Sequence, residues 1–182
     1  RAEMGQGVAT TLAALVAEEL DVDLDAITVE HGPASYAYYN SEMLAEGGPF
    51  PFFEEGVVAE LMRGGMGAFG KFLGLQGTGG SSSVRDGFDK MLAAGAAARQ
   101  MLLAAAALRL DVEIGALATA NATITHEASG RTLTYGEVAA DAARLDPPSD
   151  VRLKQPAEWR LLGKSQRRTD MHAKVTGAPI FG

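Results

Sequence analysis

Two glycine-rich segments, each directly before an apolar helical pattern, hold the residues of this sequence best suited to bind a ligand. MGQG, at positions 4–7, precedes the first pattern, and TGGSSS, at positions 78–83, precedes a longer one. Such a turn leaves backbone N–H groups unpaired at the positive end of a helix dipole, which favours phosphate, sulfate or carboxylate. Gln6 adds an amide, and Thr78 and the three serines add hydroxyl groups. Together the segments predict a large, phosphate-bearing ligand that is gripped from two sides.

Each glycine-rich segment is also compatible with an ordinary turn followed by a helix cap. A non-catalytic scaffold or interaction domain that binds no cofactor is therefore the alternative hypothesis. Neither segment is a Walker A sequence, because the final Lys-Ser/Thr pair is missing, and the GxGxxG pattern of dinucleotide-binding folds is absent. The sequence thus predicts an anion site of another type.

The titratable side chains form no recognisable catalytic or metal-binding group. The serines at 81–83 have no evident partner His and Asp and lie outside any GxSxG pattern. His31, at the end of an expected strand, could act as a base, but it is interpreted as a satisfied surface or core histidine. The pairs Glu18–Glu19 and Glu54–Glu55 are interpreted as solvated faces. The chain has no cysteine, and its three histidines lack metal-ligand spacing. We therefore expect neither a catalytic residue nor a metal ligand in this chain.

Helical periodicity predicts the elements that carry the two glycine-rich segments. Apolar residues recur at helical spacing over Gln6–Leu20 and again over Ser83–Leu108, where Asp86 is expected to complete a capping box at the helix start. The alanines of this long helix, together with Gly95, would allow close packing against a sheet or another helix. A short helix is expected over Val57–Met62, and the glycine-rich stretch that follows it is expected to be a surface loop.

Alternating apolar and polar residues predict the strands. Ile27–His31 alternates and is β-branched, and Thr123–His126 and Thr132–Thr134 are expected to form a hairpin through a Ser-Gly turn. A short helix over Tyr135–Arg144 follows the hairpin. These elements predict an α+β fold, with a small mixed sheet packed against two main helices. Residues 147–182 are expected to form an extended C-terminal arm.

The formal net charge of −7 conceals a difference between the body and the tail. Residues 151–182 hold seven of the sixteen Lys and Arg residues but only two acidic residues. This tail has no interleaved aromatic side chains and no recognised module, so we expect no nucleic-acid binding and predict that it lies on an acidic surface. The longest apolar run is mostly alanine and is interrupted by Arg99, Gln100 and Arg109, so no membrane span is expected. No charged n-region followed by an apolar h-region and a cleavage site is visible in these residues.

Five stretches of the sequence carry a resemblance to a known family. They are EMGQG with the helix after it, EELDVDLDAITVEHGPA, QGTGGSSSVRDGFDKMLAAGAAARQML, SGRTLTYGEVAADAARL and LLGKSQRRTDMHAKVTGAPIFG. Together they resemble the molybdenum-binding large subunit of the xanthine dehydrogenase and aldehyde oxidase family. The branch that they resemble is that of the isoquinoline 1-oxidoreductase beta subunit and its aldehyde-oxidising relatives. The resemblance covers almost the whole chain in order and is weakest over residues 36–74.

The resemblance implies an oxidoreductase that hydroxylates aromatic N-heterocycles or oxidises aldehydes with water as the oxygen donor. It implies a molybdopterin cofactor with molybdenum, in the cytosine dinucleotide form, and iron–sulfur clusters on a separate small subunit. Two loops of this chain are implied to contact the cofactor. They consist of Met4, Gly5, Gln6 and Gly7, and of Thr78, Gly79, Gly80, Ser81, Ser82 and Ser83. The amide of Gln6 is implied to form hydrogen bonds near the ligands of the metal.

The chain differs from the family in length. Large subunits of the family are several times longer, and the glutamate that acts as a base beside the metal lies in a C-terminal region without a counterpart here. We therefore expect an N-terminal fragment, in which residues 1–146 are part of the molybdopterin-binding domain and residues 147–182 are a basic linker to a following domain. The expected partners are the remainder of the large subunit, the small iron–sulfur subunit and a small-molecule substrate. The resemblance implies a bacterial protein of the periplasm or cytoplasm and favours the periplasm.

Overall fold

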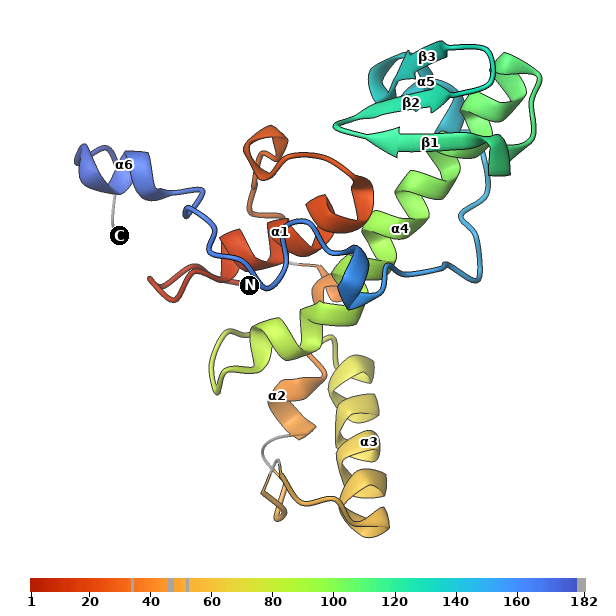
Figure 1. Cartoon of the computed structure of the whole chain (residues 1–182). Coiled ribbons are helices and arrows are strands. Elements are labelled where there is room, and N and C mark those ends of the chain that lie inside the picture. Colours follow the sequence, from red (N-terminus) through yellow and green to blue (C-terminus); the bar gives the residue numbers. More distant parts are fainter. Residues whose placement is uncertain (34, 46–47, 52, 180–182) are drawn as a thin grey trace. The chain divides into compact units, whose positions relative to one another are not determined.

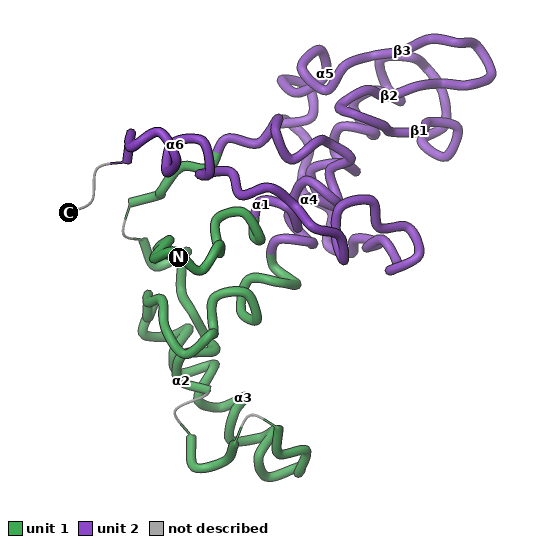
Figure 2. Tube along the Cα trace, turned by 60° about the vertical axis from the view of Figure 1, so that its left-hand side comes forward, with its two compact units in different colours: residues 1–12, 29–90 green, residues 13–28, 91–182 purple. Residues whose placement is uncertain are grey.

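The fold of the chain is of the expected α+β class. A computed structural model describes residues 1–33, 35–45, 48–51 and 53–179, and this part of the chain contains six α-helices and a three-stranded sheet (Figure 1). The chain divides into two compact units (Figure 2): unit 1 comprises residues 1–12 and 29–90, and unit 2 comprises residues 13–28 and 91–182. Helices α1 (Val8–Leu20) and α4 (Ser82–Leu110) contribute a segment to each unit, and their positions confirm the two main helices.

Unit 2 is built around the sheet. Strands β1 (Leu117–Ala120), β2 (Thr123–His126) and β3 (Arg131–Thr134) lie in the order β1-β2-β3, and both pairs are antiparallel. The buried core of this unit joins β2 to α1, α4 and α5 (Tyr135–Ala142), so the expected packing of the sheet with two main helices is confirmed. The core consists of Ala17, Val22, Ala105, Ala106, Ile124, Tyr135, Val138 and Ala142.

The expected hairpin and the helix after it are confirmed, and local interactions explain both. Gly130 adopts a φ of +67° in the turn, where its N–H group donates to the carbonyl of His126 over 2.9 Å. Thr134 and Glu137 form a capping box at the start of α5, because the Thr134 N–H donates to the Glu137 carboxylate over 2.7 Å. The short 3-10 helix Ile114–Ala116 leads into β1, which the sequence analysis did not predict.

The expected strand over Ile27–His31 is wrong. Residues 27–33 form no regular secondary structure, and Ile27 is the residue at which the short 3-10 helix Leu24–Ala26 ends. A strand needs a neighbouring strand to pair its backbone groups, and the three strands of the described sheet all come from residues 117–134. The expected mixed sheet is wrong too, because both strand pairs of the described sheet are antiparallel. The three strands follow one another in the chain through short connections, which favour this arrangement.

Unit 1 contains the 3-10 helix Tyr36–Tyr38 and the helices α2 (Glu42–Ala45) and α3 (Val57–Phe72). Helix α3 continues through the glycine-rich residues that were expected to form a loop. Two of its four glycines lie where the chain packs closely: a Cβ atom on Gly70 would lie 3.4 Å from Cδ1 of Leu44, and one on Gly67 would lie 3.6 Å from Cβ of Ser41, whereas a Cβ atom on Gly64 or Gly65 would meet nothing within 4 Å. This close packing against α2 offsets the low helix propensity of glycine.

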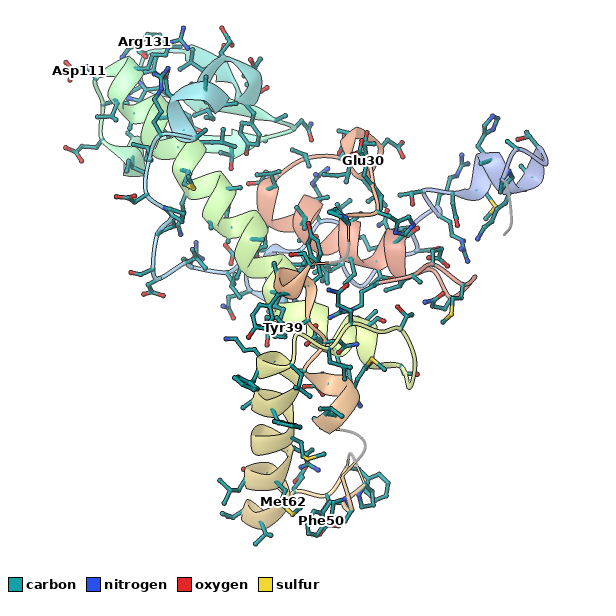
Figure 3. The ribbon with its side chains drawn as sticks, turned by 180° about the vertical axis from the view of Figure 1, so that it is seen from behind. Glu30, Tyr39, Phe50, Met62, Asp111 and Arg131 are labelled. Atoms are coloured by element: carbon teal, nitrogen blue, oxygen red, sulfur yellow. The ribbon has the colours of Figure 1, made fainter. Side chains whose placement is uncertain are left out.

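The face of α3 away from α2 is apolar and exposed. Figure 3 shows Met62 near the N-terminal end of this helix, with Tyr39 toward the other end. The exposed apolar residues of the helix are Val57, Val58, Leu61, Met62, Phe69 and Phe72.

Helix α4 is, among the described residues, the one helix long and apolar enough to cross a membrane, judged by length and composition alone. A core helix of a globular protein meets the same criterion. Helix α4 contributes Ala105 and Ala106 to the core of unit 2, and its Arg99 forms an ion pair with Glu19 over 3.3 Å. These contacts are typical of a core helix, and the expectation of no membrane span stays a prediction.

The C-terminal arm is extended, as expected. Between residues 143 and 179 the chain forms only the 3-10 helix Pro156–Glu158 and α6 (Met171–Val175), and residues 180–182 of the expected arm lie outside the described residues. The arm lies on acidic residues of its own unit. Arg160 pairs with Asp23 over 2.5 Å, and Leu161 packs against the core.

Candidate functional site

The two predicted half-sites line one pocket in unit 1. Its volume is about 430 Å³, and seven of the ten predicted cofactor-contacting residues belong to its lining. The lining consists of Met4, Gln6, Val8, Thr11, Thr78, Gly79, Gly80, Ser81, Ser83 and Val84. A hydrogen bond of 2.7 Å from the N–H of Ala2, two residues before the first segment, to Oγ1 of Thr78 holds the chain before the first segment against the second. Gly5, Gly7 and Ser82 are the predicted residues that this lining does not include.

The start of α1 is already occupied by a carboxylate of the chain itself. Oε1 of Glu3 accepts hydrogen bonds from the N–H groups of Gly5 over 2.8 Å and Gly7 over 3.0 Å, and Oε2 accepts from the Ala9 N–H over 3.1 Å. A carboxylate at this position is favourable because it faces the positive end of the helix dipole. The expectation that the first glycine turn leaves its N–H groups free for a ligand anion is therefore wrong for these three groups.

The side chain of Gln6 is folded back onto its own loop. Its Oε1 accepts from the Met4 N–H over 2.6 Å, and its Nε2 donates to the carbonyl of Ala2 over 3.0 Å. An amide nitrogen carries two hydrogens, so one donor of Gln6 is not used by this bond. Gln6 therefore shapes the loop and keeps one N–H group available to a ligand in the pocket.

The start of α4 offers donors that no part of the described chain uses. Ser83 is only 7% exposed, and no described residue forms a hydrogen bond with its hydroxyl group. The N–H groups of Gly80, Ser81 and Ser83 likewise have no acceptor among the described residues. Gly80 and Ser81 both adopt a φ of +56°, in the left-handed region, which turns the chain sharply into the helix. Donors at the N-terminus of a long helix favour an anionic oxygen.

Ser82 is the one serine of the three that is fully buried. Its Oγ donates to the carbonyl of Gly79 over 2.7 Å and accepts from Nδ2 of Asn40 over 2.9 Å. The hydroxyl of Ser82 therefore supports the loop from within the protein, whereas Ser81 and Ser83 line the pocket.

Asp86 connects α4 to two other segments of unit 1, and it does not form the expected capping box. Its fully buried carboxylate accepts from the N–H of Ser41 over 2.9 Å, from Oγ of Ser41 over 2.7 Å and from Nζ of Lys90 over 2.8 Å, and it also pairs with Arg1. Burial raises the pKa of Asp86, but the hydrogen bonds from Lys90 and Ser41 outweigh burial and hold that pKa below its ordinary value. The segment before the first glycine turn is thus tied to the helix that carries the second.

The sequence analysis missed the supporting residues Glu3, Asn40 and Asp86 in these roles. Glu3 had only a weak signal, because it lies near the start of a helical pattern, where the helix dipole favours an acidic residue, but four residues separate it from the start of α1. Asn40 had no signal in the sequence, because its hydrogen-bond partners lie about 40 residues later in the chain. Asp86 did show the pattern of a capping box, but Ser41 provides better-placed donors.

The pocket fits a phosphate-bearing ligand. Its lining holds hydroxyl and backbone donors at the α4 side, apolar groups from Met4, Val8 and Val84, and no acidic side chain that would repel an anion. None of the lining residues is Asp, Glu, His, Lys or Tyr, so the lining offers binding and orientation but no proton transfer. Within the described residues, no group of three or more His, Cys, Asp and Glu side chains is arranged to hold a metal ion.

Glu18 is buried, so its interpretation as part of a solvated face is wrong. Its carboxylate accepts from the backbone N–H groups of Arg160 over 2.9 Å, of Leu162 over 3.0 Å and of Leu161. Burial raises the pKa of Glu18, but these three backbone hydrogen bonds outweigh burial, and the pKa lies below its ordinary value. Glu18 thus anchors the C-terminal arm within unit 2.

Glu19 is equally buried, so its interpretation as part of a solvated face is wrong too, but its carboxylate is less well paired than that of Glu18. It accepts from the Lys154 N–H over 2.8 Å and forms the ion pair with Arg99. Burial raises the pKa of Glu19 above its ordinary value, because these two partners do not compensate for the loss of water. The interpretation of Glu54 and Glu55 as solvated is confirmed, since both are exposed.

The chain is similar to curated proteins over nearly its whole length. It is 30% identical over 213 aligned residues to the beta subunit of isoquinoline 1-oxidoreductase from Brevundimonas diminuta, in a match that covers 99% of this chain and 24% of that protein. It is 27% identical over 176 residues to a nicotinate dehydrogenase subunit from Pseudomonas putida, across 96% of this chain and 12% of that protein. The chain therefore spans less than a quarter of the length of either relative. No protein-family model matches it.

Proposed function

Because this chain corresponds to a fragment of the family that includes the isoquinoline 1-oxidoreductase beta subunit, we propose that it forms part of the cofactor site of a molybdenum-dependent oxidoreductase. The observation that carries the proposal is the single pocket lined by both glycine-rich segments. In the proposal, residues 78–83 bind the phosphates of a molybdopterin cofactor, and the Met4–Gly7 loop contacts its uncharged part. Glu3 supports this orientation of the cofactor, since its carboxylate at the start of α1 would repel a phosphate there.

The role of this chain in catalysis is to hold and orient the cofactor. When bound, the molybdenum cofactor supplies the oxidation chemistry, with water as the oxygen donor. The hydroxyl of Ser83 and the N–H groups of Gly80 and Ser81 provide hydrogen bonds to phosphate oxygens. The free N–H of Gln6 provides a donor at the opposite end of the pocket. No proton transfer is assigned to any residue of this chain.

The rest of the assembly follows from the family as part of the same proposal. The cofactor is the cytosine dinucleotide form, residues 1–146 are part of its binding domain, and residues 147–182 are the basic linker to the next domain. The remainder of the large subunit completes the site, and a small subunit carries the iron–sulfur clusters. The names of both relatives contain an aromatic N-heterocycle, which favours such a substrate over an aldehyde. As part of the same proposal, the protein is bacterial and belongs to the periplasm or the cytoplasm, with the periplasm favoured by the resemblance to the family.

A pair of glycine variants tests the proposal in the natively purified complex. Gly80→Val puts a β-branched side chain at the pocket, and Gly130→Val puts the same side chain at a similar positive φ in the hairpin of unit 2. We expect Gly80→Val, and likewise Gln6→Ala, to lower molybdenum and pterin content, and Gly130→Val to leave both unchanged. Wild-type cofactor content in Gly80→Val and Gln6→Ala would contradict the assignment. A wild-type complex that is active but contains neither molybdenum nor pterin would favour the scaffold hypothesis.

A further inference from the structure

Asn40 holds the glycine-rich loop from the side that does not line the pocket. Asn40 is fully buried, and its backbone N–H donates to the carbonyl of Leu75 over 2.6 Å. Its side-chain Nδ2 donates to the carbonyl of Gly77 over 3.2 Å and to Oγ of Ser82 over 2.9 Å. One buried residue, distant in sequence, thus binds the loop 75–82 at three points.

Ser82 extends the reach of Asn40 to a further peptide group. Both Oγ and the backbone N–H of Ser82 donate to the carbonyl of Gly79, over 2.7 and 3.1 Å. Asn40 therefore restrains the carbonyl of Gly77 directly and that of Gly79 through Ser82.

The rigid geometry of the peptide bond links these carbonyls to the pocket. In a planar trans peptide the C=O bond and the N–H bond of the next residue point in opposite directions. Holding the Gly77 and Gly79 carbonyls toward the buried side therefore turns the N–H groups of Thr78 and Gly80 the other way. Both Thr78 and Gly80 line the pocket.

The amide of Asn40 can take only one orientation in this site. Exchanging its oxygen and nitrogen would place Oδ1 against the carbonyl oxygen of Gly77, so that two acceptors would face each other. In the observed orientation Oδ1 is buried without a hydrogen-bond partner. An unpaired buried acceptor is unfavourable, so the two donor bonds of Nδ2 must stabilise the loop by more than this cost.

We infer that Asn40 is a positioning residue of the pocket, whose side-chain amide fixes the N–H groups of the 78–80 loop in the direction required to bind the ligand's phosphates. The inference rests on the proposed function for the identity of the ligand. Its effect on the loop itself does not depend on any ligand.

The test uses Asn40→Leu, which is close in size and cannot donate, and Asn40→Asp, which keeps the polarity but, when ionised, cannot donate to Gly77. In the natively purified complex we expect cofactor to be released about tenfold faster from Asn40→Leu, since each lost hydrogen bond contributes roughly threefold to tenfold. We also expect faster amide hydrogen exchange at residues 78–83 in both variants. Should Asn40→Leu fail to fold, Asn40→Asp provides both measurements.

Two further variants separate positioning from a general loss of stability. Ala59→Gly removes a buried methyl group near the N-terminal end of α3, a helix of the same unit that ends before the loop 75–82 begins. It should lower thermal stability but leave cofactor release and exchange at 78–83 unchanged. Ser82→Ala should have a smaller effect on cofactor release in the Asn40→Leu background than in the wild type, because both residues act on the same carbonyl.

The outcomes distinguish the inference from the proposed function. Wild-type cofactor release and wild-type exchange at 78–83 in both Asn40 variants would overturn the inference, as would equal effects of Ala59→Gly. A wild-type complex without molybdenum and pterin would overturn the proposed function. In that case the exchange measurement alone still decides whether Asn40 fixes the loop.

Discussion

Replacing Glu18 with glutamine should release the C-terminal arm from its anchor. In the wild type, Oε2 of Glu18 accepts from three consecutive backbone N–H groups, those of residues 160–162, and Oε1 accepts from the Arg160 N–H and from Nζ of Lys154, 3.4 Å away. Glutamine keeps only one acceptor oxygen. Whichever way its amide turns, the NH₂ group faces donors: either the N–H groups of residues 160–162, or Arg160 and Lys154.

The expected loss of stability follows from the bonds that the amide cannot make. A hydrogen bond to a charged group contributes about 1.5–3 kcal/mol, and removing one partner of a buried charged pair costs more. Glu18→Gln loses at least one such bond and gains a donor–donor contact, so we expect the free energy of unfolding to fall by about 3 kcal/mol. For a chain of this size that corresponds to a decrease in Tm of roughly 6–12 °C.

Glu19→Gln is the matched control, because the two neighbours are equally buried but have opposite pKa shifts. The raised pKa of Glu19 means that burial disfavours its charge, so a neutral side chain should cost less there than at Glu18. The lowered pKa of Glu18 means that its contribution is fully present above its unfolded-state pKa and is lost as the pH falls through the folded-state pKa. The Tm difference between wild type and Glu18→Gln should therefore shrink in acid.

Thermal unfolding of the purified protein across pH values measures these effects, and amide hydrogen exchange at residues 160–162 locates them. A decrease in Tm for Glu18→Gln no larger than that for Glu19→Gln, or one that grows as the pH falls, would refute the reasoning. Unchanged exchange at 160–162 would show that Glu18 does not anchor the arm.

Three further predictions concern the packing and the caps of the helices. Gly95→Ala should lower the Tm, because the added Cβ would lie 2.7 Å from the carbonyl oxygen of Val16. Gly87→Ala is the control and should be tolerated, since the only atom that close to its added Cβ is a methyl group of the flexible Leu12 side chain. Equal Tm values for the two variants would contradict this reasoning. Glu3→Gln should speed amide exchange at residues 5–9 and destabilise the start of α1 by about 1 kcal/mol, and unchanged exchange would argue against the cap. Because the pKa of Asp86 is lowered in the folded state, the stability that its carboxylate contributes is lost as the pH falls through that pKa. Asp86→Asn should therefore show a smaller loss of stability between neutral and acidic pH than the wild type. An identical dependence of stability on pH in the two proteins would exclude this contribution of Asp86.

Elements with strong local signals could be predicted from the sequence. The helix over residues 8–20, the long helix α4 and the hairpin with its following helix all follow from periodicity and turn chemistry within a few residues. Each glycine-rich segment could be recognised as a helix start, because a helical pattern follows it directly. The structure brings residues of both segments together in the lining of one pocket. Local chemistry is sufficient where the partners of a residue are close in the sequence.

Elements that depend on distant partners could not be predicted. The alternation over Ile27–His31 is typical of a strand, but no strand is available to pair with it among the described residues. The glycines of α3 are poor helix formers, and the close packing of Gly67 and Gly70 against residues 40–44 has no signal in the local sequence. The burial of Glu18 depends on an arm that lies more than 130 residues later in the chain. Asn40 illustrates the same limit for the site itself.

The most direct test of the central claim is a crystal or cryo-EM structure of the cofactor-loaded complex, at a resolution that places the phosphates. We predict that the phosphate oxygens lie within hydrogen-bonding distance of the Ser83 hydroxyl and of the N–H groups of Gly80 and Ser81, with Glu3 still bound to the start of α1. Phosphates located away from residues 78–83, or at the start of α1 with Glu3 displaced, would contradict it.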